Sequence, residues 1–251
     1  MEEQTKKIRT AFVLGAGLGM RLRPLTEECP KPLLSVRGRP LVTYAMDHLL
    51  GIGVERFIVN THHMAHRYVE AFPGGTWRGA PISFRFEPTL LDTGGGLKNI
   101  EDLLGEDEAV WVYNGDILTD LPLEKLLCVH TAGGCEVTLA LRSTGPVQNV
   151  GLDAAGRICD FRGILGADAD QSLQFTGIYI VERPFFRRLR AGMQQDIVPV
   201  FVEMVRTLPG SVGYALIDDG VWEDIGTMDA YAALQWRGPA PAIGARQGED
   251  G

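Results

Sequence analysis

The sequence predicts an α/β protein, with a Rossmann-like three-layer α/β/α domain built on a mostly parallel mixed sheet. In the first half of the chain, apolar β-rich runs alternate with amphipathic runs of helix length, which is the order of right-handed β-α-β crossovers. The expected strands are apolar almost throughout, as is typical of strands covered on both faces. Glycine-rich turns follow some of them, at the edge where open α/β sheets bind ligands.

The first half contains strands and helices in strict alternation. Strands rich in β-branched and aromatic residues are bounded by turn signals, and the helices repeat apolar residues at helical spacing. The acidic, glycine-containing stretch 105–108 forms a turn before a strand. We expect strands over 9–14, 55–60, 82–87 and 109–116, and helices over 40–51, 65–72 and 96–104.

The second half is less regular and suggests an antiparallel extension of the sheet. A hairpin is expected over 150–161, turning between Asp153 and Gly156. Further strands are expected over 135–143, 173–182 and 212–218, and helices over 184–190, over 197–208 and from Met228 onward. The chain therefore predicts one domain over 1–237, followed by a Gly-, Pro- and Ala-rich tail over 238–251 that we expect to be disordered.

Composition limits the classes of partner. Lys and Arg number 24 against 32 Asp and Glu, a net charge of −8, which argues against nucleic acid and against anionic membranes. No apolar run is long enough for a membrane span, and the charged N-terminus has no leader pattern, so we expect a cytoplasmic protein, either a monomer or a small homo-oligomer. No CxxC pairing links Cys29, Cys128, Cys135 and Cys159, which we expect to be reduced, buried thiols.

The glycine-rich stretch 15–19, GAGLG, directly follows the first expected strand. A dinucleotide fingerprint fits poorly, because the third glycine is misplaced and the second strand ends in Asn60 and Thr61 instead of an acid. A Walker loop is excluded, because no Gly-Lys-Ser/Thr follows.

A basic and conformationally restricted segment comes next. Arg21 and Arg23 follow the glycines, and prolines flank Lys31 on both sides. Backbone N–H groups, a guanidinium and an ammonium on such a segment suit a polyphosphate. The alternative is a surface loop whose arginines pair with Glu27 and Glu28.

Residues 16–34, AGLGMRLRPLTEECPKPLL, resemble the signature of the sugar-1-phosphate nucleotidyltransferases, G-x-G-[TEM]-R-[LM]-x-P-L-T followed by P-K-P. Three later segments resemble that family in the family's order: LLDTGGGLKN (90–99), VYNGDIL (112–118) and WEDIGTMDAY (222–231). Taken singly, each has a plain alternative: a loop, a turn aspartate or a helix cap. Their co-occurrence favours the family, and implies a nucleotide-diphospho-sugar transferase fold with a catalytic domain over 1–237.

The resemblance implies attack of a sugar 1-phosphate on the α-phosphorus of a nucleoside triphosphate, with release of diphosphate and with Mg²⁺ as cofactor. Arg21 would hold the leaving phosphates, Lys31 would bridge the two substrates, and Asp116 and Asp224 would bind the metal. The expected nucleotide-binding residues are Gly15, Ala16, Gly17, Gly19, Glu87, Thr93, Gly94 and Gly95, and the expected sugar-binding residues are Asn114, Thr176 and Gly177.

The base and the sugar stay open at this point. A carboxylate at Glu87 could accept from guanine or from uracil. The short chain resembles N-acetylmuramate-1-phosphate uridylyltransferases, although Asp92 stands where these usually have Glu; mannose- and heptose-1-phosphate guanylyltransferases share nearly all the motifs. Asp160 and Arg162 fall loosely where some members carry a Glu-Lys pair. Two alternatives remain: a catalytically silent sugar-nucleotide-binding regulator, and a cytidylyltransferase for a non-sugar phosphate such as phosphocholine.

Two other signals are interpreted plainly. His62 and His66 have the i, i+4 spacing of a metal site, but no Glu or third ligand completes it, so we expect helix-entry or surface histidines. Residues 72–82, FPGGTWRGAPI, are expected to form a mobile loop.

Overall fold

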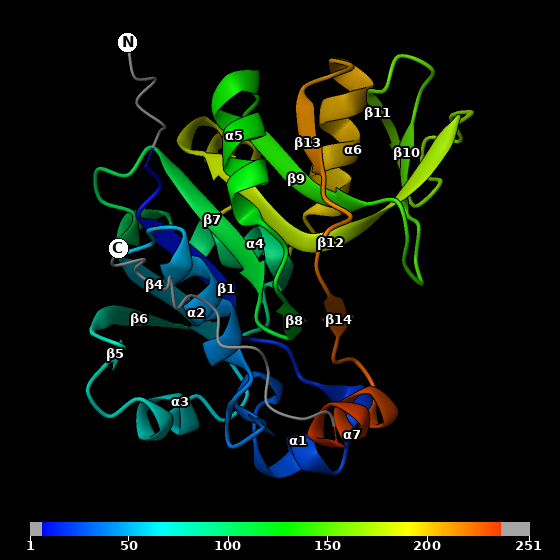
Figure 1. Cartoon of the computed structure of the whole chain (residues 1–251). Helices are drawn as coiled ribbons and strands as arrows, with labels where there is room; N and C mark the ends of the chain where they lie inside the picture. Colours follow the sequence, from blue (N-terminus) through cyan, green and yellow to red (C-terminus); the bar gives the residue numbers. More distant parts are fainter. Residues whose placement is uncertain (1–6, 237–251) are drawn as a thin grey trace, which may run out of the picture.

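A ten-stranded mixed sheet forms the centre of the computed structural model, which describes residues 7–236. The strand path runs β11-β10-β12-β7-β1-β4-β6-β5, and β9 joins β12 to β13 (Figure 1). The strands are β1 (Thr10–Leu14), β4 (Arg56–Thr61), β5 (Thr76–Trp77), β6 (Ala80–Phe86), β7 (Ala109–Asn114), β9 (Val137–Arg142), β10 (Val150–Leu152), β11 (Ile158–Phe161), β12 (Gln171–Glu182) and β13 (Val212–Leu216).

Helices cover both faces of this sheet, which confirms the predicted three-layer α/β/α architecture. They are α1 (Leu25–Glu28), α2 (Val42–Gly51), α3 (His66–Ala71), α4 (Asp92–Asn99), α5 (Leu123–Gly133), α6 (Val198–Thr207) and α7 (Met228–Trp236), with 3-10 turns η1 (Met20–Leu22), η2 (Lys31–Leu33), η3 (Glu101–Leu103) and η4 (Arg183–Arg188). Figure 1 places α2 and α5 on the near face and α4 on the far face.

Alternating side chains of the strands feed two hydrophobic cores. In β1, Phe12 packs into the core that contains α4 and α6, whereas Ala11 and Val13 pack into the core that contains α2, α3 and α5. Both faces are therefore buried, which explains why the strands read as continuous apolar runs instead of alternating ones.

The parallel strands β6, β4, β1 and β7 place the candidate site. β1 pairs in parallel with β4 on one side and with β7 on the other, so the chain reverses its direction of winding at β1. Open α/β sheets bind ligands at such a switch point, beyond the carboxyl ends of the strands. Here these ends are Leu14, Thr61 and Asn114.

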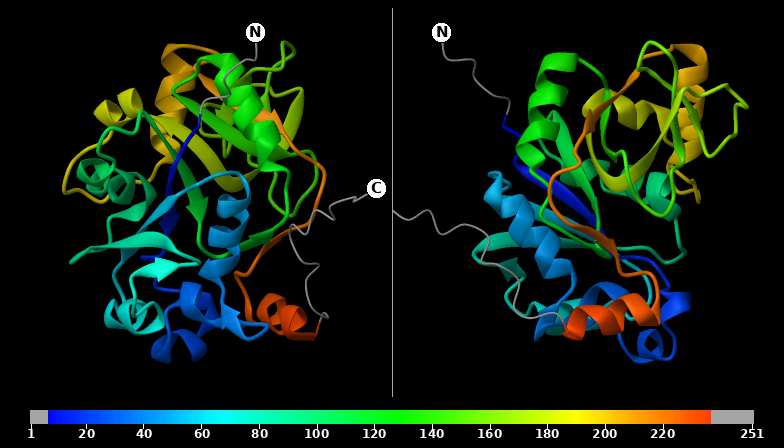
Figure 2. Two further views of the ribbon diagram at one scale, coloured as in Figure 1. Left: turned by 60° about the vertical axis from the view of Figure 1, so that its left-hand side comes forward. Right: turned by 45° about the vertical axis from the view of Figure 1, so that its right-hand side comes forward.

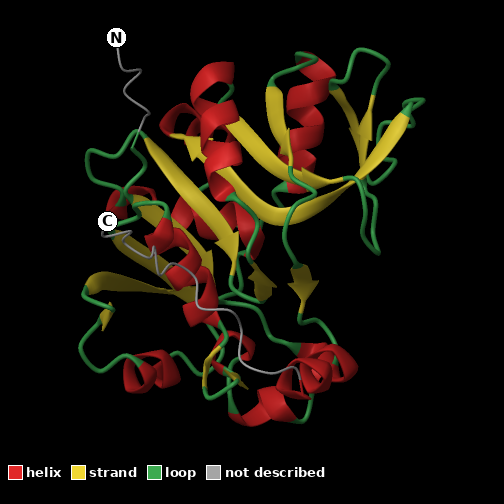
Figure 3. Cartoon of the chain, viewed as in Figure 1, coloured by secondary structure: helices red, strands yellow, loops and turns green. Residues whose placement is uncertain are grey.

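Two small ribbons and the last helix close the side of the site. β2 (Ser35–Val36) pairs with β3 (Arg39–Pro40), and β8 (Ile117–Thr119) pairs with β14 (Trp222–Asp224). The helix α7 lies against β2, far from the strands β9 to β13 that precede it (Figures 2 and 3). A small core of Ile225 and Leu234 against Val36, Leu41 and Tyr44 holds it there.

Several element predictions need correction. The helix expected over 96–104 begins at Asp92, and the one expected over 184–190 is a 3-10 turn. Residues 72–82 include β5 and the start of β6, which pair as an antiparallel ribbon, so part of that stretch is a β-ribbon and not a loop. The helix α5 was not expected from the sequence. The hairpin over 150–161 is confirmed, because β10 and β11 pair antiparallel. In its turn, the Asp153 carboxylate accepts hydrogen bonds from the Ala155 and Arg157 amides.

The cysteines carry no disulfide, as expected, but burial was predicted wrongly. Cys128 is exposed on α5, and the other three are half-buried. Partial desolvation raises the pKa of the Cys29, Cys135 and Cys159 thiols. Within residues 7–236, no helix is long and apolar enough to cross a membrane. The predicted tail over 238–251 lies outside the described residues.

Candidate active site

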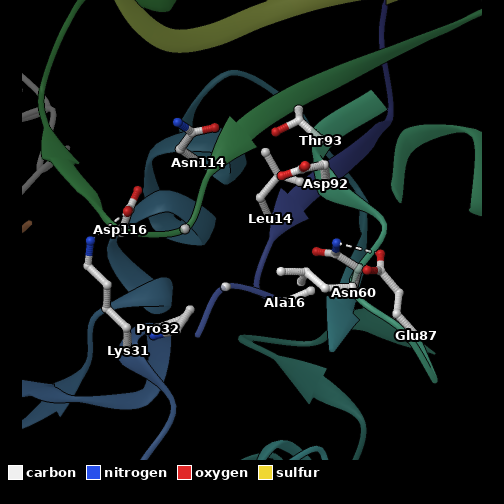
Figure 4. Close-up of a pocket in the computed structure, with 13 residues that line it drawn as sticks. Leu14, Ala16, Lys31, Pro32, Asn60, Glu87, Asp92, Thr93, Asn114 and Asp116 are labelled. Carbon is white, nitrogen blue, oxygen red and sulfur yellow. Dashed lines mark hydrogen bonds and ion pairs between the residues drawn. The ribbon is translucent and has the colours of Figure 1, made fainter. Parts of the chain in front are cut away.

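A pocket of about 200 Å³ lies at the carboxyl edge of β1, β4 and β7 (Figure 4). It gathers residues from five segments: the glycine loop, the lysine segment, the end of β6, the start of α4 and the Asn-Gly-Asp turn. Its lining residues are Leu14, Ala16, Gly17, Lys31, Pro32, Asn60, Glu87, Leu90, Asp92, Thr93, Asn114, Gly115 and Asp116.

The glycine loop needs its glycines for close approach. A Cβ at Gly15 would lie 2.6 Å from the Asn60 carbonyl oxygen, a separation that real structures do not tolerate. Gly19 has φ +61°, and a Cβ there would meet Thr26 and Lys31, so this glycine satisfies both a left-handed turn and a tight contact. The loop is thereby held against the lysine segment.

Lys31 is almost buried, with 8% of its surface exposed. It opens η2, and Pro30 precedes it in extended conformation. Its Nζ atom lies 2.6 Å from Asp116 Oδ2 and 3.7 Å from Asp224 Oδ1. A buried ammonium held by two carboxylates is charge-compensated, which makes its position well defined.

The β8–β14 ribbon brings together two aspartates that are far apart in the sequence. Asp116 directly precedes β8, Asp224 ends β14, and the Ile225 amide donates to the Asp116 carbonyl at 3.1 Å. The indole Nε1 of Trp222 donates to the Thr176 carbonyl at 2.9 Å, which ties β14 to β12. The ribbon therefore creates the pairing of Asp116 with Asp224 that the sequence only suggested.

Four charged groups converge at this point. Burial, followed by the neighbouring Asp116 charge, raises the pKa of the Asp224 carboxyl, and Lys31 and Arg21 oppose that rise. A Cβ at Gly226 would lie 2.9 Å from Arg21 Nη2 and 3.0 Å from Asp224 Oδ2, so both side-chain ends lie close to the Gly226 backbone. Arg23, by contrast, forms an ion pair with Glu27 on the surface. This is the pairing that the surface-loop alternative predicted for Arg23.

Glu87 lies in the pocket wall with its carboxylate already engaged. Its Oε1 atom accepts from Asn60 Nδ2 at 2.8 Å, and its Oε2 atom accepts from the Leu91 amide at 3.1 Å. Burial raises its pKa. Asn60 was not predicted as a site residue, because it was used only to reject a dinucleotide site. The signal that could have identified it is an amide side chain at the end of a parallel strand.

The glycines of 94–96 lie inside α4 and not in a loop before it. The Gly94 and Gly95 amides both donate to the Gln195 carbonyl, at 2.8 and 3.1 Å, and neither residue lines the pocket. A Cβ at Gly95 would lie 2.3 Å from the Met193 carbonyl oxygen. These glycines pack the helix against 193–195, and their predicted nucleotide contact is not carried by free amides. Thr93 does line the pocket.

The three predicted sugar-binding residues are brought together, but in different environments. Asn114 lines the pocket. Gly177 lies beside Asn114, in a bulge of β12, and has a positive φ of +79°. Thr176 is fully buried, and its hydroxyl donates to the Ala140 carbonyl at 2.8 Å, so only its backbone could face a ligand.

The remaining signals lie apart from the pocket. His62 and His63 bond to the carbonyls of Glu87 and Thr26, and no cluster of three or more His, Cys, Asp or Glu within the described part of the chain could hold a metal by itself. Asp160 caps the amides of Leu165 and Ala167, whereas Arg162 pairs with Asp196, so they do not form a Glu-Lys-like pair.

A glycine-rich loop at a sheet switch point, next to a lysine held by two aspartates, is the arrangement expected of a transferase of the nucleotidyl class. The chain belongs to the nucleotidyl transferase family, whose model matches residues 10–236. The expected resemblance is thereby confirmed.

Relatives of this family are named for sugar phosphates. A mannose-1-phosphate guanylyltransferase of Mycobacterium tuberculosis is 31% identical over 248 residues, covering 95% of this chain and 68% of the relative. An N-acetylmuramate alpha-1-phosphate uridylyltransferase of Neisseria meningitidis is 29% identical over 220 residues, covering 87% and 93%.

Solved structures support the fold. A putative glucose-1-phosphate thymidylyltransferase from Bacillus anthracis superposes with a TM-score of 0.75 at 20% identity, covering 94% of this chain and 98% of that one. An inositol-1-phosphate CTP transferase from T. maritima gives a TM-score of 0.74 at 20% identity, covering 92% and 96%. At these identities the likeness shows the nucleotide-diphospho-sugar transferase fold alone.

Proposed function

We propose that this protein transfers a uridylyl or guanylyl group from a nucleoside triphosphate to a sugar 1-phosphate, with release of diphosphate. The observation that carries the proposal is the position of Lys31, which is nearly buried and reaches both Asp116 and Asp224 at the ligand-binding edge of the sheet. Family membership and the named relatives support the same class of reaction.

The chemistry requires neutralised charge and an in-line approach, because a phosphate nucleophile is repelled by the phosphates it attacks. The backbone of 15–19 would cradle the triphosphate. Arg21, exposed at the loop, would hold the β- and γ-phosphates of the leaving group. Lys31 would contact the α-phosphate and the incoming sugar phosphate, and would release its present carboxylate partners to do so.

The donor set fits a hard divalent cation. Asp116 and Asp224 offer carboxylate oxygens around one cationic position, now taken by the Lys31 ammonium. Mg²⁺ binds through one or two carboxylates and completes its shell with water and substrate phosphates, so a third protein ligand is not required. When bound, Mg²⁺ would supply neutralising charge to the reacting phosphates.

The nucleotide is proposed to lie along Ala16, Gly17 and Thr93, and the sugar toward Asn114. Thr176 and Gly177 would contribute backbone groups only, because the Thr176 hydroxyl is buried. We propose that Gly94 and Gly95 support the nucleotide wall through their packing against 193–195.

The test is diphosphate release by purified protein with Mg²⁺. ATP, CTP, GTP, TTP and UTP are each paired with hexose, hexosamine, muramate and heptose 1-phosphates and with phosphocholine. We expect turnover with UTP or GTP and one of the sugar phosphates. Turnover confined to CTP and phosphocholine would replace the proposal with the cytidylyltransferase alternative, and silence across the panel would favour a regulatory protein.

A further inference from the structure

A chain of hydrogen bonds with little exposure to solvent runs along one wall of the pocket. The Gly15 amide donates to Asn60 Oδ1 at 2.7 Å, Asn60 Nδ2 donates to Glu87 Oε1 at 2.8 Å, and the Leu91 amide donates to Glu87 Oε2 at 3.1 Å. Figure 4 shows the Asn60 and Glu87 side chains pointing toward each other at one side of the pocket. Asn60 is 2% exposed and Glu87 0%.

This chain joins two segments that are distant in sequence. At one end it fixes the first residue of the glycine loop, whose carbonyl also accepts from the Tyr68 hydroxyl at 2.8 Å. At the other end it fixes the residue that precedes α4, where Asp92 and Thr93 face the pocket. Gly96 leaves room for the hydrogen bond between Asn60 and Glu87, because a Cβ there would lie 2.9 Å from Glu87 Oε1 and 3.0 Å from Asn60 Nδ2.

The polarity of the chain determines which residue types can complete it. Both ends are backbone N–H donors, so the two side chains must offer an acceptor at each end and one donor between them. One amide and one carboxylate satisfy this condition; two amides or two ionised carboxylates do not. Each oxygen of the Glu87 carboxylate accepts one hydrogen bond from the protein in this arrangement.

Resting on the proposed function, we propose that Asn60 and Glu87 are positioning residues: together they set the distance between the glycine loop and the start of α4, and thereby the affinity for the nucleoside triphosphate. They act through the backbone of Gly15 and Leu91, whose amides they hold. Their effect falls on the nucleotide and not on the sugar phosphate.

The experiment transposes the pair. Asn60→Asp places two carboxylates face to face, and Glu87→Gln gives the Leu91 amide a mismatched partner. In the double variant Asn60→Asp/Glu87→Gln, the carboxylate now at position 60 accepts from the Gly15 amide and from the side-chain amide now at position 87, whose oxygen accepts from Leu91. The number of carboxylates is unchanged. We expect each single variant to weaken UTP or GTP binding by roughly 10- to 100-fold, and the double variant to recover to within about threefold of wild type.

Thr138→Val is the matched control. Thr138 Oγ1 lies 2.8 Å from His130 Nδ1 in a buried pair between β9 and α5, so this variant loses a buried hydrogen bond without touching the pocket. Calorimetric titration with UTP and with GTP, steady-state KM for both substrates, and hydrogen exchange at the Gly15 amide are measured for wild type and all four variants. We expect the control to match wild type in nucleotide affinity, and the single variants to raise KM for the nucleotide alone and to speed exchange at Gly15.

The outcomes separate the two proposals. Wild-type protein that binds neither nucleotide overturns the proposed function. If wild-type protein binds one of them, two results overturn the positioning role. Either the single variants keep the wild-type nucleotide affinity, or the double variant binds as weakly as the weaker single variant. Unchanged exchange at Gly15 in Asn60→Asp also overturns it, whichever nucleotide binds.

Discussion

Gly95→Ala tests whether the glycines of α4 serve packing. The added Cβ would lie 2.3 Å from the Met193 carbonyl oxygen and 3.1 Å from Leu91 Cβ. The first of these is a backbone atom, which cannot rotate away. Either α4 or the 193–195 segment must therefore shift, and the hydrogen bonds from Gly94 and Gly95 to the Gln195 carbonyl would lengthen.

The expected cost is a balance of two opposing effects. Overpacking a close contact costs about 1–3 kcal/mol, with the upper end favoured here by the rigid partner, and replacing glycine in a helix returns about 1 kcal/mol. A net loss of about 1–2 kcal/mol lowers the melting temperature of a domain of this size by roughly 2–8 °C. Gly133→Ala is the control, because this α5 residue has nothing within 4 Å of an added Cβ, and it should stabilise by about 0.5–1 kcal/mol.

The assay is thermal and urea unfolding of both variants without ligand, followed by nucleotide titration. Packing predicts lost stability for Gly95→Ala in the ligand-free protein. A variant as stable as wild type that nonetheless loses nucleotide affinity would refute the packing argument, and would return this glycine to direct contact with the nucleotide.

Three further predictions concern charge. Lys31→Met should lower the rate of diphosphate release at least about 1000-fold, with a melting temperature close to that of wild type. Lys125→Met, which loses only an exposed ion pair with Asp219, should keep wild-type turnover. Substantial turnover in Lys31→Met would contradict the role given to this lysine. Chelation by EDTA should abolish turnover and added Mg²⁺ should restore it; full activity in EDTA would remove the metal from the proposal. Burial lowers the pKa of His48, so below about pH 6.5 the unfolded state binds a proton that the folded state does not; the unfolding free energy of wild type should fall with acid more steeply than that of His48→Gln, and equal slopes would count against this.

Sequence patterns predicted the sheet and its helices well because they depend on local periodicity and on turns at the chain's glycines and prolines. They failed where long-range contacts decide. The start of α4 at Asp92 depends on the Gln195 carbonyl that accepts from Gly94 and Gly95, and no local signal reports a partner so distant along the chain. The antiparallel pairing of β5 with β6 was likewise not predicted, because both strands lie in or next to a glycine-rich stretch.

The candidate site divides in the same way. Lys31, Asp116 and Asp224 were found from motifs, and the structure brings them within an ion-pair distance of one another through the β8–β14 ribbon. The engagement of Glu87 by Asn60 could not be seen, because it depends on how β4 and β6 end side by side. Burial of Thr176 follows from a bulge in β12, which the sequence marks only with a glycine.

The most direct measurement follows the label in the reaction. Wild-type protein is incubated with Mg²⁺, the active sugar 1-phosphate, and UTP or GTP labelled with ³²P at either the α- or the γ-phosphate. The account predicts α-label in a nucleotide sugar and γ-label in diphosphate, both only when the sugar phosphate is present. Release of γ-label as orthophosphate, or transfer that does not require a sugar 1-phosphate, would contradict it.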